Sequence, residues 1–127
     1  MPRSSQGKAV VLVVEDDFLI RANAADMVRD FGFEAIEAVD ADDAISVLEG
    51  PAAISVVFTD IQMPGAMDGL KLAAFIRDRW PPVKLVLTSG NFRPEAGSLP
   101  EGARFILKPY SENNLIELLH TSLAESS

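Results

Sequence analysis

The chain contains no cysteine and only one histidine among its 127 residues. Without cysteine it can form neither disulfide bonds nor thiolate metal sites, and nothing in its composition demands an oxidising compartment. It also lacks a signal-peptide pattern, and its apolar runs are far shorter than the roughly 20 residues of a membrane-spanning helix. We therefore expect a cytoplasmic protein that does not enter a membrane.

Positive charge is scarce as well, with 11 lysines and arginines against 19 aspartates and glutamates and a formal net charge of -8. This surplus would repel the phosphates of nucleic acids and the headgroups of anionic membranes. We expect neither to bind directly, and a cation or a protein partner fits better. Hydrophobic residues make up 48% of the chain, enough for one core in a length too short for two ordinary domains.

Five short strand-like runs, most of them apolar, alternate with segments of helical periodicity. The runs predict strands at Ala9–Val14, Glu34–Ala38, Ile54–Phe58, Val83–Leu87 and Ala103–Leu107. Helices are predicted after Asp17 up to Gly32, and over Asp40–Glu49, Asp68–Arg79 and Ser111–Ala124. A fifth helical segment is expected in residues 91–102, where three breakers, Pro94, Gly97 and Pro100, leave room for a turn or two.

This alternation predicts an α/β fold, a doubly wound parallel sheet in three layers with helices on both faces and right-handed crossovers. In such sheets the carboxyl ends of the strands form the ligand-binding edge. Acidic residues follow the first strand at Glu15-Asp16-Asp17, and Asp60 follows the third. Thr88 and Lys108 end the fourth and fifth strands, so we expect these side chains to lie at the same edge.

Each of these residues has an ordinary structural role when taken alone, as a turn residue, a helix cap or a surface cation. Their placement at one edge favours a shared site. The three carboxylates of Glu15, Asp16 and Asp60 would repel one another without a counter-ion. Oxygen ligands alone favour Mg²⁺, and such a site suits a phosphoryl group with Asp60 as the nucleophile, Lys108 as a second cation and Thr88 as a hydroxyl donor.

Four motifs together resemble the receiver domain of two-component response regulators: residues 11–17 (VLVVEDD), 58–65 (FTDIQMPG), 87–90 (LTSG) and 105–109 (FILKP). The resemblance covers the chain from Lys8 to about Ala124. It implies the flavodoxin-like strand order 2-1-3-4-5, which we take from the family. It also implies a cis peptide bond between Lys108 and Pro109.

The resemblance further implies a role for each matching residue. Asp60 would take a phosphoryl group from the phosphohistidine of a sensor histidine kinase or a histidine phosphotransfer protein. Asp16 would bind Mg²⁺ directly, Glu15 through water or by positioning, and Gln62 through its backbone carbonyl. Thr88 would move toward the aspartyl phosphate, Lys108 would pair with it, and Phe105 would be the switch aromatic that turns inward.

On this reading, residues 1–8 are a flexible lead-in, residues 9–124 are the receiver domain, and no residues are left for an output domain. The chain would signal to an unidentified downstream protein by changing a contact surface, and it could form a homodimer. It would be no enzyme beyond catalysing its own phosphorylation and dephosphorylation.

Alternatives remain open. The chain could act as a phosphate sink or shuttle with no downstream contact. An aspartate-nucleophile phosphatase would need a second carboxylate where Gln62 stands. A flavin or nucleotide binder would need glycines and hydroxyls in place of Glu15-Asp16-Asp17. His120 is expected to be a solvated helix residue.

Overall fold

The computed structural model describes residues 8–65, 67–91, 93–95 and 97–125. The strands in these ranges are β1 (Val10–Val14), β2 (Glu34–Ala38), β3 (Val56–Asp60), β4 (Lys84–Ser89) and β5 (Arg104–Leu107). The helices there are α2 (Phe18–Asp30), α3 (Ala41–Glu49), α4 (Gly69–Arg79) and α5 (Glu112–Ala124). None of these helices has the length and apolar character needed to span a bilayer.

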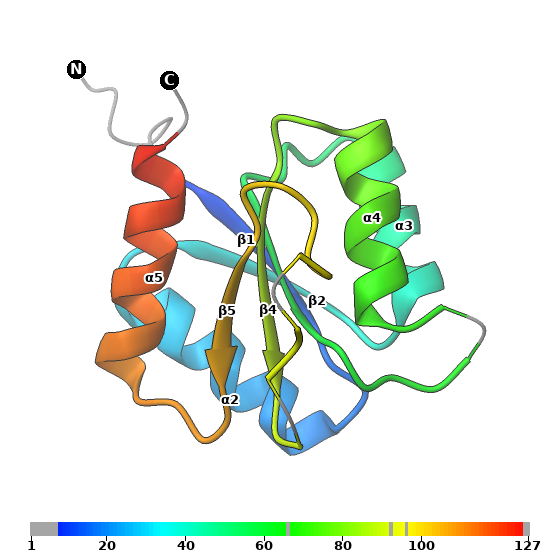
Figure 1. Ribbon diagram of the computed structural model, residues 1–127. Coiled ribbons are helices and arrows are strands. Elements are labelled where there is room, and N and C mark those ends of the chain that lie inside the picture. The colour runs from blue at the N-terminus through cyan, green and yellow to red at the C-terminus, as the bar shows by residue number, and fades with distance from the viewer. Residues whose placement is uncertain (1–7, 66, 92, 96, 126–127) are drawn as a thin grey trace.

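The strands form one parallel sheet in the order β2-β1-β3-β4-β5 (Figure 1), which confirms the expected fold class and strand order. The third strand begins at Val56, later than the predicted Ile54, and it includes Asp60 instead of stopping before it. Asp60 therefore remains in the ladder, in register with Thr88 on β4. This register fixes the phosphoacceptor candidate and the hydroxyl candidate as direct neighbours.

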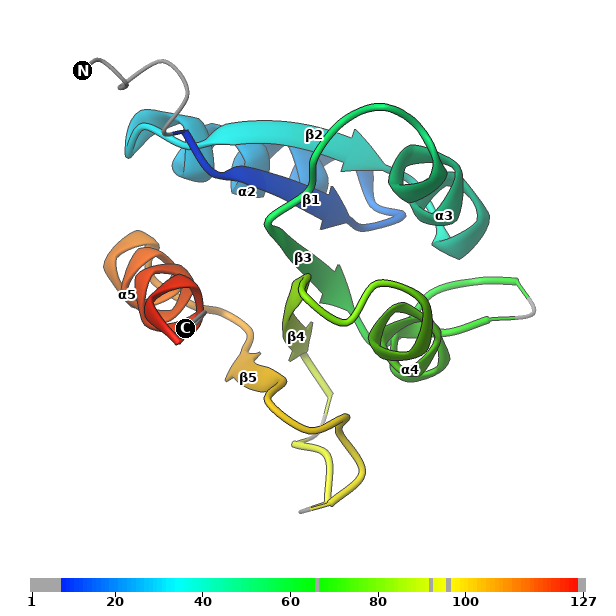
Figure 2. The same ribbon diagram turned by 90° about the horizontal axis from the view of Figure 1, so that it is seen from above.

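The sheet separates two apolar layers. Viewed from above, α2 and α5 lie on one side of the twisted sheet, and α3 and α4 lie on the other (Figure 2). Alternate residues of the strands point to opposite faces, so on β1 Leu12 packs into the α3/α4 layer, whereas Val11 packs into the α2/α5 layer. The central strands β1, β3 and β4 are buried on both faces, which requires near-continuous apolar runs, and this is why the sequence predicted them well.

Side-chain caps begin all four helices of the described ranges. The carboxylates of Asp17, Asp40 and Asp68 and the hydroxyl of Ser111 each accept a hydrogen bond from a backbone N–H in the first turn. The caps at Asp17 and Ser111 were predicted from the sequence. Each cap satisfies a donor that the helix itself cannot, which stabilises the helix by about 1 kcal/mol.

The expected helical segment in residues 91–102 is wrong for the part of it that the structure describes. The chain there forms turns, with the N–H of Ser98 bonded to the carbonyl of Glu95 and the N–H of Ala103 bonded to that of Pro100. Gly97 adopts a φ of 91°, outside the helical region. With proline and glycine breaking the segment, no stretch is long enough to propagate a helix. From this segment, Leu99 packs against the α3/α4 core, and Arg93 lies over the ring of Phe105 on β5.

Candidate functional site

The acidic cluster forms where β1 and β3 end, as the sequence predicted. One carboxylate oxygen each of Glu15, Asp16 and Asp60 lies within 4.8 Å of the other two. Glu15 and Asp60 are 5% and 6% exposed, whereas Asp16 is open to solvent. The parallel order brings β1 beside β3, so residues 45 positions apart share one pocket.

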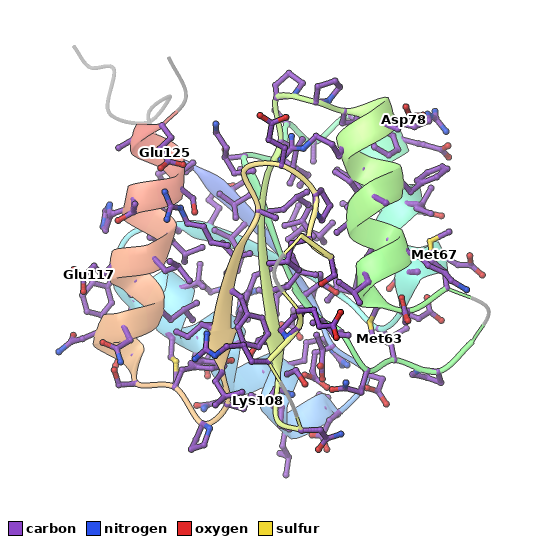
Figure 3. All side chains as sticks on the ribbon, in the orientation of Figure 1. Met63, Met67, Asp78, Lys108, Glu117 and Glu125 are labelled. Atoms are coloured by element: carbon purple, nitrogen blue, oxygen red, sulfur yellow. The ribbon has the colours of Figure 1, made fainter. Side chains whose placement is uncertain are left out.

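Lys108 completes this cluster from the end of β5, at the sheet edge where the strand arrows finish (Figure 3). Its Nζ donates to Asp60 Oδ2 at 2.8 Å and to Glu15 Oε1 at 3.0 Å. The peptide bond from Lys108 to Pro109 is cis, as the resemblance implied. One ammonium group thus holds two buried carboxylates.

The electrostatics of the pair follow from burial and from these contacts. Burial raises the pKa of Glu15, and the Asp60 charge adds to this, even though bonds from the Asp17 N–H and from Lys108 act in the opposite direction. Burial by itself would lower the pKa of Lys108, but hydrogen bonds to Asp60 and Glu15 outweigh it, so that pKa is raised. Lys108 is therefore charged at neutral pH, and Glu15 gives up its proton less readily than a free glutamate.

Thr88 lies beside Asp60 on β4 with its hydroxyl unused. Its Oγ1 is buried and has no hydrogen-bond partner in the structure. With Glu15 and Asp60 it lines a small cavity of about 10 Å³. A buried hydroxyl without a partner costs roughly 1–3 kcal/mol, so its retention points to a ligand that it meets in another state.

Tyr110 closes the same cavity and was missed by the sequence reasoning. Its ring contacts Phe58 edge-on, with centroids 5.6 Å apart. Burial raises the pKa of the Tyr110 phenol to about 12. The signal available in the sequence was its position directly after Lys108-Pro109, the motif that ends the fifth strand at the site.

Gln62 contacts the carboxylate oxygen of Asp60 that Lys108 does not contact. Its backbone N–H donates to Asp60 Oδ1 at 3.2 Å, and its side-chain Oε1 accepts from Ser89 Oγ at 2.8 Å. Ser89 in turn accepts from the Asn91 N–H at 3.2 Å. The role of Ser89 could not be found from local patterns, because the bond joins a residue of β4 to the loop that follows β3.

Gly69 explains how the first turn of α4 reaches the site. A Cβ at this position would lie 2.1 Å from the carbonyl oxygen of Asp60 and 2.7 Å from the Cα of Ile61. The Gly69 N–H donates to the carbonyl of Ile61 at 2.8 Å. Only glycine permits this approach, so the residue after the Asp68 cap positions the backbone of Asp60.

Phe105 and His120 lie apart from the cluster. Phe105 is half-buried on the α3/α4 face, in register with Leu87, and the guanidinium of Arg93 lies 5.3 Å from its ring centroid. His120 is exposed on α5 with its ring against Phe33. The assigned switch role of Phe105 therefore stays a prediction, and His120 is placed as the sequence indicated.

The donor set fits a hard divalent cation. Three carboxylates provide the oxygen ligands that Mg²⁺ prefers, and one of them, Asp16, faces solvent where the ion can enter. The orphaned Thr88 hydroxyl and the Lys108 ammonium flank Asp60 as donors for an anion. Oxygen ligands for a cation and donors for an anion therefore lie on either side of the Asp60 carboxylate.

Comparison with known proteins agrees with this geometry. The family described as the response regulator receiver domain matches residues 11–120. Response regulator protein FleR of Pseudomonas aeruginosa is 35% identical over 114 residues, covering 87% of this chain and 24% of FleR. The receiver domain of NtrX from Brucella abortus has a TM-score of 0.83 at 34% identity, covering 91% of this chain and 99% of that one.

A response regulator receiver protein from Sinorhizobium medicae has a TM-score of 0.89 at 24% identity and covers 96% of this chain and 99% of its own, which shows the shared fold. The chain spans only about a quarter of the length of the relatives it matches first, 24%, 26% and 23%. Among the described elements, the match nonetheless includes β2 to β5, all of β1 except Val10, and most of α5. The acidic edge, the order of the strands and the family match lead to one conclusion: this chain belongs to the response regulator receiver domain family.

Proposed function

We propose that the chain is a phosphorylation switch in which Asp60 accepts a phosphoryl group from a phosphohistidine of a sensor histidine kinase or a histidine phosphotransfer protein. In this step an Asp60 oxygen bonds to phosphorus while the phosphorus–nitrogen bond breaks, and the leaving imidazole takes up a proton from solvent. Family membership supports the reaction class. The orphaned hydroxyl of Thr88 beside Asp60 carries the proposal for this chain.

The Thr88 hydroxyl supports the proposal because it is buried without a hydrogen-bond partner in the unphosphorylated protein. A phosphoryl group on Asp60 would bring acceptor oxygens to the strand position adjacent to Thr88. Lys108 would exchange its bond to the Asp60 carboxylate for bonds to the same oxygens. The hydroxyl of Thr88 would then gain the acceptor that it lacks in the free protein, and Lys108 would keep an anionic partner.

Glu15, Asp16 and Asp60 would hold Mg²⁺, with the backbone carbonyl of Gln62 as a further ligand. When bound, the ion would neutralise the carboxylates and attract the oxygens of the incoming phosphoryl group. The buried Glu15 would remain fixed by the Asp17 N–H, which donates to its Oε2 at 3.1 Å. Asp16 is the solvent-exposed ligand of the set.

A surface beside the site suits a protein phosphodonor. Residues of α2 and the segment after β5 line an open, largely apolar groove of about 640 Å³ that includes Lys108. Phe18 and Leu19 at the start of α2 are 65% and 74% exposed, next to this groove. Exposed apolar side chains clustered at a reactive site are typical of a docking surface.

The decisive experiment is phosphorylation by a small phosphodonor with Mg²⁺, followed by mass spectrometry of the intact chain. The parent should gain one phosphoryl group that hydroxylamine removes, and Asp60→Asn should gain none. Asp26→Asn, a matched change at an exposed aspartate of α2, should behave as the parent. If Asp60→Asn takes up phosphate as readily as the parent, the assignment is wrong.

Phosphorylation should reach the surface through Thr88 and Phe105. Phe105 is half-buried beneath Arg93, so an inward turn of its ring would free that guanidinium. We expect slower amide hydrogen exchange around Phe105 after phosphorylation of the parent, and no change in Thr88→Val. Phosphate turnover without such a change and without phosphorylation-dependent binding would favour a phosphate sink.

A further inference from the structure

Arg21 is a nearly buried cation that the site described above does not use. Its side chain is only 11% exposed, although it lies near the start of α2. The Nε donates to Glu37 Oε1 on β2 at 3.1 Å, and Nη1 donates to the backbone carbonyl of Glu15 at 2.9 Å. The guanidinium thus joins α2, the edge strand β2 and the loop that carries the acidic cluster.

The carbonyl bond fixes the peptide between Glu15 and Asp16. On the other side of Glu15, its N–H donates to the carbonyl of Ala38 at 3.1 Å. Because the N–H and the carbonyl of Glu15 are both hydrogen-bonded, the orientation of the backbone leading into Asp16 is fixed. Arginine suits this task better than lysine, because its planar fork can satisfy two acceptors at fixed angles.

Removing the guanidinium of Arg21 from water costs free energy, and its ion pair with Glu37 alone does not explain why the group is buried. A buried pair commonly contributes no more than apolar residues of the same volume would. Here Nη1 of Arg21 donates to the carbonyl of Glu15, beside two metal-ligand candidates, and Glu37 holds the guanidinium in place through Nε. The arrangement is that of an outer partner which orients ligands without touching the ion.

We propose that Arg21 is a positioning residue for the divalent-cation site, acting through the carbonyl of Glu15 and held in place by Glu37. The inference rests on the proposed function, because it assigns Arg21 to the same Mg²⁺ site. Its competing explanation is a structural staple between α2 and β2, with no influence on the cluster.

Arg29 provides a matched control. It leaves the same helix, reaches Glu37 Oε2 at 3.6 Å and donates to the carbonyl of Ala35 at 3.2 Å. Arg29 therefore joins α2 to β2 as Arg21 does, but its side chain bonds to Ala35, Asp26 and Glu37 and not to the loop that carries the acidic cluster. Replacing either arginine by glutamine removes the same charge from the same helix.

Whether Mg²⁺ affinity falls or rises on replacement of Arg21 distinguishes a positioning role from a purely electrostatic effect of its charge. Loss of a nearby positive charge should by itself tighten the binding of a cation. Loss of the carbonyl bond should weaken it, because the carboxylates are no longer aimed together. For orienting partners of metal ligands the loss is about 10- to 100-fold in affinity.

The experiment is calorimetric titration of the full chain with Mg²⁺, together with urea unfolding followed by the fluorescence of Trp80. Arg21→Gln should bind Mg²⁺ at least about 10-fold more weakly than the parent, and Arg29→Gln should bind it equally or more tightly. Arg21→Lys, which keeps the charge and at most one of the two bonds, should fall between Arg21→Gln and the parent and serves if the glutamine variant unfolds.

The outcomes are distinguishable. If the parent binds Mg²⁺ and both glutamine variants bind it equally well, Arg21 is a structural staple and the inference is overturned. If Arg21→Gln binds more tightly than the parent, charge outweighs positioning, which also overturns it. If the parent itself binds no Mg²⁺, the proposed function fails and the inference fails with it.

Discussion

Replacing Lys108 by methionine tests the electrostatics of the site most directly. The Nζ lies 2.8 Å from Asp60 Oδ2 and 3.0 Å from Glu15 Oε1. At an effective dielectric constant of about 20, each contact contributes about 6 kcal/mol of attraction. Most of this offsets the cost of removing the charges from water, and the Lys108 side chain is still 20% exposed. We therefore expect Lys108→Met to lower the free energy of unfolding by about 2–4 kcal/mol at pH 7.

The size of this loss should depend on pH in a defined way. Burial raises the folded-state pKa of Glu15 above its ordinary 4.5, so the folded chain holds that proton more tightly than the unfolded chain. Stability is therefore lost as pH rises from about 4.5 through the folded pKa, and more is lost when Lys108 is absent. Lys108 has a raised pKa, so its own contribution is lost above about pH 10.5. The difference between parent and variant should be small in acid, largest near neutrality and smaller again in strong base.

Magnesium should reverse the defect. The ammonium group competes with a cation for the same carboxylates, so its removal should tighten Mg²⁺ binding by roughly 10-fold. Saturating Mg²⁺ should then restore stability in proportion to that affinity. The assay is urea unfolding with Trp80 fluorescence, with and without Mg²⁺.

The control for this series is Lys84→Met, at the opposite end of β4, where the ammonium donates to the carbonyl of Glu125 at 3.3 Å. That variant should show neither the pH dependence nor the response to Mg²⁺. Equal stability of Lys108→Met and the parent at pH 7, or weaker Mg²⁺ binding by the variant, would refute the reasoning.

Three further predictions follow from single contacts. Thr88→Val removes a buried hydroxyl without a partner, so urea unfolding should show the free protein unchanged or stabilised by about 1 kcal/mol, while its response to phosphorylation is lost; clear destabilisation would mean that the hydroxyl already has a partner. Gly69→Ala places a Cβ 2.1 Å from the Asp60 carbonyl oxygen. It should lower the free energy of unfolding by about 2–3 kcal/mol and weaken Mg²⁺ binding. The control Gly50→Ala, whose Cβ would lie 3.4 Å from the Val47 carbonyl oxygen, should be tolerated. Tyr110 is the only tyrosine, and its ultraviolet titration should have a midpoint near 12 in the folded chain and near 10 in urea, with stability lost as pH rises between the two; a folded midpoint near 10 would show that the phenol is solvated.

Local patterns determined the elements of this protein. Buried parallel strands need continuous apolar runs, and helices need caps and a periodic apolar face, so the strands, four helices and the caps at Asp17 and Ser111 could be predicted. The position of an acidic residue directly after a strand likewise indicated the ligand-binding edge. The expected helical segment in residues 91–102 failed, since weak local signals there gave way to turns in the part that the structure describes.

Only the tertiary structure decided how that edge works. The unused hydroxyl of Thr88, the bond from Ser89 to Gln62 and the close approach of Gly69 to Asp60 join residues on different elements. The anchoring of Glu15 by Arg21 also depends on which helix face meets which loop. Such contacts depend on the packing of elements against one another, and no period or spacing along the chain encodes them. The sequence by itself therefore determined which groups are present at the site, and the packing of strands and helices decided which of them are bonded, which are idle and which hold the others in place.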